Sequence, residues 1–262
     1  MPDQEPQFIT VGTGDDSRQI AVLHDDGQRP GVLWLGGFKS DMIGTKAQAL
    51  VDWAKETGRA CTRMDYSGHG YSGGKFADGT ISRWLEESLA VFNQFCRGPT
   101  VVIGSSMGGW MALLLARAHL MAKANVDGRL HAMVLIAPAP DFTEELMWKN
   151  FSDDIKNQIE TQGYYEEPSE YSDEPYVITK KLIDDGRANL LFGAPIETGC
   201  PVHILQGAQD PDVPWQHAQE LVARLAHDDV VMTLVKDGDH RLSRPQDIDR
   251  MVRIVGDMAA SG

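Results

Sequence analysis

In the stretch TVVIGSSMGGW, residues 104–108 match the pattern G-x-S-x-G with Ser106 at its centre. Strand-forming residues precede the motif, and an alanine- and leucine-rich helical pattern follows it. A strand that turns directly into a helix forces its apex residue into strained backbone angles and exposes that side chain. Gly104 and Gly108 fit this turn, because a Cβ at either position would clash with it. We predict Ser106 as an exposed nucleophile and Ser105 as a buried residue bonded to backbone.

Such a serine needs a base and an orienting acid, which follow it along the chain in the order acid, then histidine. The strand-like run VHILQG is followed by AQDPDVPW, which places Asp210 and Asp212 just after a strand. The run VVMTLV is followed by KDGDHRLS, which places His240 before the last helix. We predict His240 as the base and Asp210 as the acid, because Asp210 is nearer the strand end; Asp212 is the alternative. His69, which lies in a loop, is the rival base.

The negative charge that forms on a carbonyl oxygen attacked by such a serine needs backbone N–H donors, which together form an oxyanion hole. One donor is predicted at Met107, because the residue after the nucleophile begins a helix whose N-terminus favours negative charge. The second is expected in the loop LGGFKSDM, where Gly36 and Gly37 let the backbone turn toward the serine. We predict the N–H of Phe38 as this second donor.

The elements that must position these residues follow from hydrophobic periodicity. Strand-like runs occur at 7–11, 18–24, 31–36, 60–66, 100–104, 132–137, 202–207 and 230–235. Helical patterns occur at 43–58, 80–96, 108–124, 178–192, 214–227 and 245–259. The first two strands are close enough for a hairpin, whereas the later ones alternate with helices. We therefore predict an α/β fold with a mostly parallel, roughly eight-stranded sheet, an antiparallel start and helices on both faces.

The connection between the sixth and seventh strands is much longer than a crossover helix requires. Residues 141–177 are rich in aromatic and acidic residues, and we predict that they form a small cap inserted into a core of residues 1–140 and 178–262. Ligand pockets are mostly apolar, so the cap aromatics are candidates for a substrate pocket above the serine. These candidates are Trp148, Phe151, Tyr164, Tyr165, Tyr171 and Tyr176. The alternative is that the rings only attach the cap to the core.

Composition narrows the classes of partner. The 262-residue chain is 42% hydrophobic, as is typical of a globular protein, and its net charge of -14 argues against nucleic acid and anionic membrane surfaces. No apolar run is long enough for a transmembrane helix, and the N-terminus lacks a signal-peptide pattern. Cys61, Cys96 and Cys200 are predicted to be reduced, which favours a cytoplasmic location. We expect a monomer or a homodimer.

A second glycine pattern, Gly68-x-Gly70-x-x-Gly73, follows the fourth strand-like run. A dinucleotide site would need a helix that opens within the motif and a carboxylate at the end of the next strand. Because KFADGT intervenes, we interpret this segment as a structural loop and predict no cofactor. No group of histidine, cysteine and carboxylate residues has the spacing of metal ligands, so no metal is predicted either.

These motifs together resemble the α/β-hydrolase superfamily, and within it the branch of mitochondrial palmitoyl-protein thioesterases and acyl-glucuronide esterases. The resemblance rests on GFKSDMIGTKA, RMDYSGHGYSGG, GSSMGGWMALL, DPDVPW and DHRLS, in this order over residues 30–245. It implies that a Ser106–Asp210–His240 triad hydrolyses acyl esters or thioesters through an acyl-enzyme, without a cofactor. Its substrates would be small molecules or S-acylated proteins, the latter by depalmitoylation.

Two features depart from the relatives. Gly36 stands where many members of the superfamily carry a histidine, and the missing presequence suggests a bacterial relative rather than the organellar protein. Two other functions also fit the same residues. Hydrolases of carbon–carbon bonds or lactones use the same triad, and a non-catalytic ligand receptor can keep both the fold and the triad.

Overall fold

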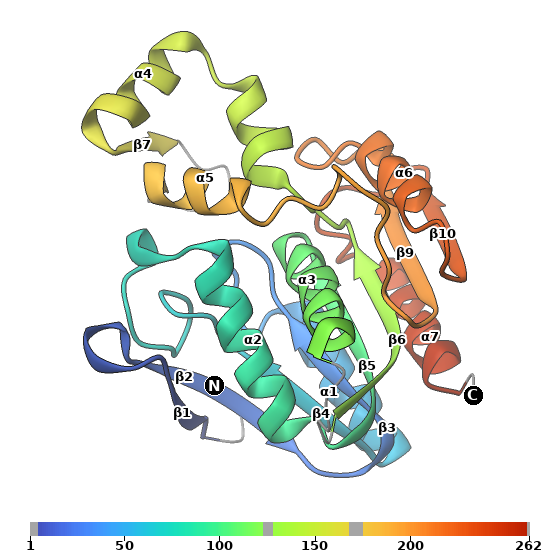
Figure 1. The fold of residues 1–262 in the computed structure, drawn as a ribbon. Coiled ribbons are helices and arrows are strands. Elements are labelled where there is room, and N and C mark those ends of the chain that lie inside the picture. Colours follow the sequence, from blue (N-terminus) through green and yellow to red (C-terminus); the bar gives the residue numbers. More distant parts are fainter. Residues whose placement is uncertain (1–4, 123–127, 168–174, 261–262) are drawn as a thin grey trace.

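The computed structural model describes residues 5–122, 128–167 and 175–260. Within these ranges, eight strands form one sheet in the order β1-β2-β4-β3-β5-β6-β9-β10 (Figure 1). They are β1 (Gln7–Val11), β2 (Arg18–Asp25), β3 (Gln28–Leu35), β4 (Arg59–Met64), β5 (Gly98–Ser105), β6 (Gly128–Ile136), β9 (Val202–Gly207) and β10 (Val230–Val235). The predicted fold class is confirmed, and each of these strands overlaps a predicted run.

The strand directions bring the predicted site together. β1 and β2 form the expected antiparallel hairpin, and β2 also pairs antiparallel with β4. From β4 through β3, β5, β6 and β9 to β10, every neighbouring pair is parallel. Parallel strands end at the same edge of the sheet, which is where ligands bind in such folds. The loops after β3, β5, β9 and β10 carry Phe38, Ser106, Asp210 and His240, so this edge collects all four residues.

Helices cover both faces of the sheet (Figure 1). One face packs against α2 (Ile81–Phe95), α3 (Met107–Ala122) and α6 (Trp215–Arg224), and the other against α1 (Thr45–Thr57) and α7 (Pro245–Ala260). Two short 3-10 turns are η1 (Gly14–Asp16) and η2 (Phe76–Asp78). The first ten residues of α3, Met107 to Ala116, are all buried. A helix enclosed on every side explains why this segment is apolar without an amphipathic period.

The long connection between β6 and β9 forms a separate lobe above the edge of the sheet that bears the site (Figure 1). Its elements are a π-helical turn η3 (Thr143–Met147), the 3-10 turn η4 (Trp148–Asn150), α4 (Asp153–Gln162), β7 (Tyr164–Glu167), β8 (Tyr176–Thr179) and α5 (Lys180–Arg187). β7 and β8 form an antiparallel hairpin. The expected cap boundary at residue 177 falls inside β8, because Val177 pairs with Glu166. From here on, the cap means residues 141–187.

The cap has a small core of its own. Phe151, Ile159, Ile178 and Ile183 are buried together, so α4, the hairpin and α5 share one apolar cluster. α5 also contributes Leu182 to the main core beside α2, and this anchors the cap to the body of the protein. The predicted helix at 178–192 is therefore shorter than expected, since residues before Lys180 are needed in β8.

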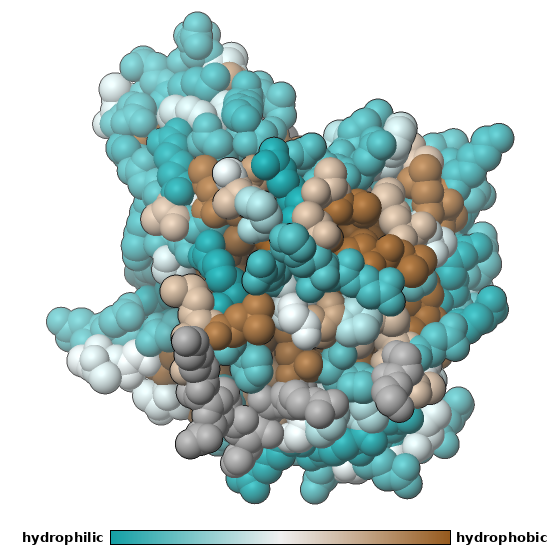
Figure 2. Space-filling model, turned by 45° about the vertical axis from the view of Figure 1, so that its right-hand side comes forward, coloured by the Kyte–Doolittle hydropathy of each residue, from teal (hydrophilic) through white to brown (hydrophobic). Residues whose placement is uncertain are grey.

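Hydrophilic residues cover the outside of the cap, while hydrophobic residues gather below it on the face shown in Figure 2. None of the described helices is long and apolar enough to cross a membrane. The three cysteines are unpaired and buried.

Candidate active site

The turn from β5 into α3 has the strained geometry that the G-x-S-x-G pattern predicts. Ser106 lies between the last residue of β5 and the first of α3, with a positive φ of 55°. A Cβ on Gly104 would lie 2.3 Å from the carbonyl oxygen of Gly108. A Cβ on Gly108 would lie 2.0 Å from the carbonyl oxygen of Leu35 in β3. Both glycines are therefore required for close backbone contact, which holds Ser106 at the apex.

The neighbouring Ser105 is buried, as expected, but the predicted bond to backbone is wrong. Among the described residues, none forms a hydrogen bond with its hydroxyl; its side chain lines the cavity beside Ser106 instead. The alternation of side chains along β5 does not predict which way the Ser105 side chain points, because Ser105 is the last residue of the strand.

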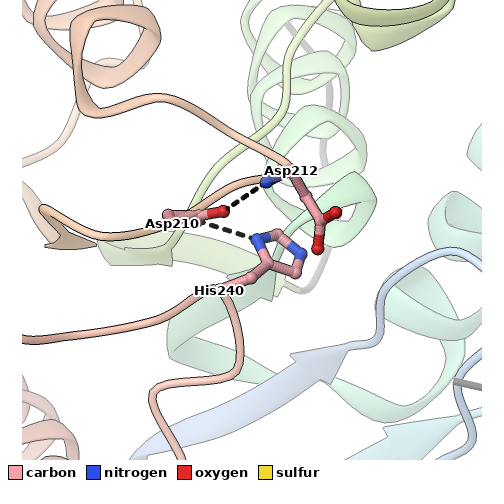
Figure 3. Close-up of side chains that lie close together, drawn as sticks. All are labelled: Asp210, Asp212 and His240. Atoms are coloured by element: carbon pink, nitrogen blue, oxygen red, sulfur yellow. Dashed lines mark hydrogen bonds and ion pairs between the residues drawn. The ribbon is translucent and has the colours of Figure 1, made fainter. Parts of the chain in front are cut away.

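His240 bridges Ser106 and Asp210. Its Nε2 lies 3.1 Å from Ser106 Oγ. Its Nδ1 lies 2.8 Å from Asp210 Oδ2, and Figure 3 shows this second contact. The two loops that carry the histidine and the aspartate are themselves in close contact, because Gln209 N–H donates to the carbonyl of Gly238. A Cβ on Gly207 would lie 2.4 Å from that same carbonyl oxygen. The glycine at the end of β9 thus lets the two loops meet.

Asp210, rather than Asp212, has the position of an orienting acid. Its side chain is 0% exposed and accepts hydrogen bonds from the backbone N–H groups of Asp212 and Val213, at 2.9 and 2.8 Å, and from Gln206 Nε2 at 3.2 Å. A buried carboxylate that accepts this many hydrogen bonds is held in one orientation. Asp212 is exposed, and its side chain points past the imidazole (Figure 3).

Asp210, Asp212 and His240 are also the group of possible metal ligands found among the described residues, with donor atoms within 4.8 Å of one another. Both oxygens of Asp210 already accept hydrogen bonds, and one of them accepts from the imidazole itself. A metal bound by all three residues would have to displace these bonds. The group therefore fits an ion poorly and a hydrogen-bonded relay well.

The loop after β3 lies directly against the serine turn. A Cβ on Gly37 would be 3.3 Å from Ser106 Cβ, so this glycine allows the loop to approach. The next residue, Phe38, makes no hydrogen bond through its N–H to any other described residue. Met107 is the first residue of α3, where backbone N–H groups have no partner within the helix. Phe38 and Met107 thus both line the cavity beside Ser106, and their role as oxyanion donors stays a prediction.

A cavity of about 700 Å³ opens beside Ser106, between the core and the cap. The cap contributes Leu146, Met147, Glu167 and Tyr176 to its wall, and the core contributes apolar residues such as Phe38 and Val213. The charged residues of the wall include the basic Lys39, Lys46 and Arg241 and the acidic Asp41 and Asp212. Burial lowers the pKa of Lys46 to about 8, although Asp239 nearby opposes this shift.

We expected several of the six cap aromatics to wall this cavity, but among the described residues one of them does. Tyr176 lines it, and Tyr171 lies outside the described residues. Phe151 and the partly buried Trp148 and Tyr165 pack into the core of the cap, and Tyr164 is 43% exposed on β7. The physical reason is that so small a lobe has few aliphatic residues and needs these rings for its own core. The cavity wall is formed by the π-helical turn instead, whose Leu146 and Met147 carry no aromatic signal in the sequence.

Both ring nitrogens of His69 bond to groups other than Ser106, which excludes this rival base. Its Nε2 is 3.0 Å from the N–H of Lys39, and its Nδ1 is 3.1 Å from the carbonyl oxygen of Ser67. The surrounding glycine-rich loop does not open a helix, and a Cβ on Gly70 would lie 2.0 Å from the carboxylate of Asp65. The loop is therefore closed on itself and leaves no room for a dinucleotide phosphate.

The fold and this arrangement of residues define a class of protein. The family model described as the alpha/beta hydrolase family matches residues 32–253, and the chain belongs to that family. The resemblance inferred from the sequence motifs is thereby confirmed.

Individual members of the family are similar to this chain in sequence and in structure. The palmitoyl-protein thioesterase ABHD10, mitochondrial, of Pongo abelii is 33% identical over 244 residues, which are 93% of this chain and 77% of the relative. A putative hydrolase from Agrobacterium vitis has a solved structure that is 54% identical, with a TM-score of 0.94 over 97% of this chain and 98% of the other. The solved structure of mouse alpha/beta hydrolase domain-containing protein 10 is 30% identical, with a TM-score of 0.85 over 97% and 98% of the two chains.

Proposed function

We propose that this protein is a serine hydrolase that cleaves acyl esters or acyl thioesters through an acyl-enzyme intermediate. The observation that carries the proposal is the continuous relay from Ser106 through His240 to Asp210, with distances of 3.1 and 2.8 Å. Relatives described as palmitoyl-protein thioesterases support the choice of acyl substrates.

The first half-reaction forms the acyl-enzyme. The carboxylate of Asp210 only accepts hydrogen bonds, so His240 carries its proton on Nδ1 and leaves Nε2 free to accept one. Nε2 takes the hydroxyl proton while Ser106 Oγ bonds to the carbonyl carbon of the substrate. The negative charge that develops on the carbonyl oxygen is stabilised by the N–H groups of Phe38 and Met107. The carbon–oxygen or carbon–sulfur bond then breaks, and His240 returns the proton to the leaving alkoxide or thiolate.

The second half-reaction releases the acid. Water attacks the acyl carbon and gives a proton to Nε2 of His240, and the same two N–H groups stabilise the charge again. The bond to Ser106 Oγ breaks, the serine recovers its proton from the histidine, and the carboxylic acid leaves. Because every proton is exchanged within the relay, no cofactor enters the reaction.

The walls of the cavity support an apolar acyl group and a polar leaving group. Phe142, Leu146 and Met147 line the apolar side, so each methylene of an acyl chain buried there contributes roughly 0.8 kcal/mol. Lys46, Arg241 and the exposed Asp212 also line the cavity and supply its polar groups. We expect activity to rise from acetyl to medium-length acyl groups and to fall when the chain exceeds the cavity.

The test is hydrolysis of p-nitrophenyl esters and acyl thioesters of graded chain length. An acyl glucuronide, a lactone and a diketone that is cleaved at a carbon–carbon bond are assayed alongside them. Turnover of esters or thioesters that disappears in Ser106→Ala supports the proposal. Turnover of the carbon–carbon substrate or lactone alone would identify the alternative hydrolase. Binding without turnover of any compound would identify a receptor and refute the proposed activity.

The cellular location of the protein stays a prediction. The free, buried cysteines support a reducing compartment such as the cytoplasm, whereas the ABHD10 relatives are described as mitochondrial. S-acylated proteins remain candidate substrates on the strength of those relatives, and fractionation of the source cells tests the location. Whether the chain is a monomer or a homodimer is tested by light scattering.

A further inference from the structure

The loop that carries Phe38 is held from outside by the loop after β4. Lys39 N–H donates to His69 Nε2 at 3.0 Å, and Met42 N–H donates to Asp65 Oδ1 at 2.7 Å. Lys39 itself has a φ of 58°, a left-handed conformation that costs a residue with a side chain roughly 1–2 kcal/mol. Such a conformation persists only where neighbouring groups fix it, and Lys39 is the residue whose N–H donates to His69.

The two bonds of His69 define one protonation state. The carbonyl oxygen of Ser67 can only accept a hydrogen bond, so the proton of the imidazole lies on Nδ1. Nε2 is then the free acceptor that Lys39 N–H requires. His69 is 4% exposed, and burial lowers its pKa to about 4, so the ring stays neutral near pH 7. The rings of Phe76 and Trp84 enclose it at centroid distances of 5.2 and 5.4 Å.

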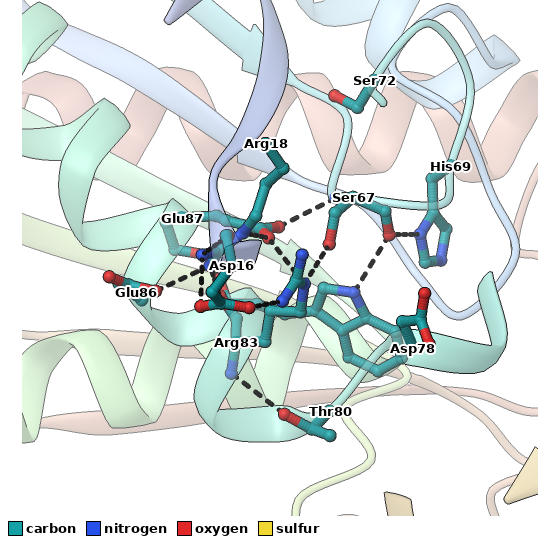
Figure 4. A network of polar contacts seen from close by, with 12 residues as sticks. Asp16, Arg18, Ser67, His69, Ser72, Asp78, Thr80, Arg83, Glu86 and Glu87 are labelled. Carbon is teal, nitrogen blue, oxygen red and sulfur yellow. Dashed lines mark hydrogen bonds and ion pairs between the residues drawn. The ribbon is translucent and has the colours of Figure 1, made fainter. Parts of the chain in front are cut away.

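A buried polar network fixes the orientation of Ser67 in turn (Figure 4). Its N–H donates to Glu87 Oε2 at 2.8 Å, and its hydroxyl accepts from Arg83 Nε at 3.1 Å. Glu87 is itself paired with Arg18 at 2.6 Å, and their side chains are 0% and 1% exposed. Breaking such a pair is costly, so the network is rigid. The rigidity of the core therefore reaches Lys39 through Ser67 and His69.

We propose that His69 is a positioning residue for the oxyanion hole: by accepting the N–H of Lys39, it fixes the peptide that follows Phe38 and so aims the N–H of Phe38 at the substrate carbonyl. This inference rests on the proposed hydrolase activity. His69 touches neither the substrate nor Ser106, so its effect is transmitted through the backbone. The charge that Phe38 stabilises exists only in the transition state, and His69 should therefore affect kcat rather than KM.

A matched pair of amides separates this role from general stability. The oxygen of His69→Gln reaches the place of Nε2 and can accept the N–H of Lys39. The shorter His69→Asn can replace only the bond from Nδ1 to Ser67. The Ser67 carbonyl also accepts from Trp84 Nε1 at 3.2 Å, so it keeps a partner in the glutamine variant. His69→Phe keeps the ring shape and makes neither bond.

With p-nitrophenyl butyrate as substrate, we expect kcat of the glutamine variant to stay within about threefold of the wild type. The asparagine and phenylalanine variants should lose ~10- to 100-fold in kcat, with KM changed by less than about threefold, since removing an oxyanion donor entirely costs ~10²- to 10³-fold. His203→Asn is the control, because His203 bonds Thr233 in the sheet at 2.9 Å, away from the site. It should leave kcat unchanged.

The outcomes separate the inference from the proposed function. Absence of esterase and thioesterase turnover in the wild type contradicts the proposed function, whatever the His69 variants do. An active wild type with equal kcat in the glutamine, asparagine and phenylalanine variants overturns the positioning role, as does a change confined to KM. If a variant does not fold, long-range ¹H–¹⁵N NMR spectra of the wild type show which nitrogen of His69 carries the proton. A proton on Nδ1 at neutral pH supports the positioning role, and a proton on Nε2 overturns it.

Discussion

Asp210→Asn should inactivate the protein by reversing the tautomer of His240. Asp210 Oδ1 accepts the two backbone N–H groups of its own loop, whereas Oδ2 accepts from the imidazole and from Gln206 Nε2. An asparagine must keep its oxygen toward the backbone donors, so its NH₂ group replaces Oδ2. This NH₂ faces Nδ1 of His240, which then has to accept rather than donate. The ring proton moves to Nε2, and the imidazole can no longer take the proton of Ser106.

The same geometry gives the size of the effect. An equivalent substitution in serine proteases lowers kcat about 10⁴-fold, which corresponds to about 5 kcal/mol of transition-state stabilisation. The new NH₂ also faces the donor Gln206 Nε2, which cannot rotate away because it donates to the carbonyls of Gly207 and Val213 as well. Two donors facing each other in a buried site should cost about 1–3 kcal/mol of folding free energy.

The assay is kcat for p-nitrophenyl butyrate, with the free energy of unfolding from urea denaturation measured in parallel. Asp212→Asn is the matched control, because it keeps the backbone N–H through which Asp212 bonds to Asp210. We expect its kcat to stay within about threefold of the wild type. If Asp212→Asn were the more damaging change, or if Asp210→Asn kept more than about a tenth of the activity, the assignment of the acid would be wrong.

Four further predictions follow from the site. Ser106→Ala should abolish labelling by a fluorophosphonate while Ser105→Ala keeps it, and peptide mapping of the label at Ser105 would contradict the turn geometry. Gly108→Ala should cost about 3 kcal/mol or more of unfolding free energy in urea titrations, because its Cβ would lie 2.0 Å from the carbonyl oxygen of Leu35; an unchanged midpoint would refute the close contact. Between about pH 6.5 and pH 4, His69 is protonated in the unfolded chain but not in the folded chain, where its pKa is about 4. The free energy of unfolding therefore decreases as the pH is lowered through this range. His69→Gln should escape up to about 3 kcal/mol of that acid-induced loss, and an identical pH dependence of the two unfolding curves would contradict the buried neutral ring. Protein dialysed against EDTA should keep its full esterase activity, and restoration of lost activity by added zinc would overturn the metal-free relay.

Much of the fold was predictable, because the core strands and helices have clear periodicities. The runs at 202–207 and 230–235 match β9 and β10 to the residue, since each is a short β-branched segment between polar turns. The boundaries of the helices and strands in the cap were harder to predict. Its hairpin has only four residues on each strand, with exposed and half-buried positions alternating weakly, and the same residues continue into α5. No local pattern marks where the hairpin ends and the helix begins.

The candidate site also contains residues that the sequence predicts and residues that it does not. Ser106, Asp210 and His240 follow three strand ends, so a parallel sheet brings them together whatever the details of packing. The direction of a cap side chain depends on tertiary contacts that the sequence does not reveal, and this is why the aromatic residues were misassigned. The contact of His69 with Lys39 was missed for a related reason. It joins two loops that are 30 residues apart, and its only signal is a histidine within a glycine-rich turn.

The ring of Phe38 has a consequence for how this protein can evolve. It meets Phe76, Phe142 and Tyr176 edge-on, at centroid distances of 4.8, 5.6 and 5.8 Å, so it touches the core, the π-helical side of the cavity and the cap hairpin at once. A change in the cap that admits a new acyl group therefore also moves the residue whose backbone is proposed to stabilise the reacting carbonyl. Under the proposed function, we expect changes of substrate range to alter the catalytic rate as well, and lineages that remodel the cap should show compensating substitutions around this ring.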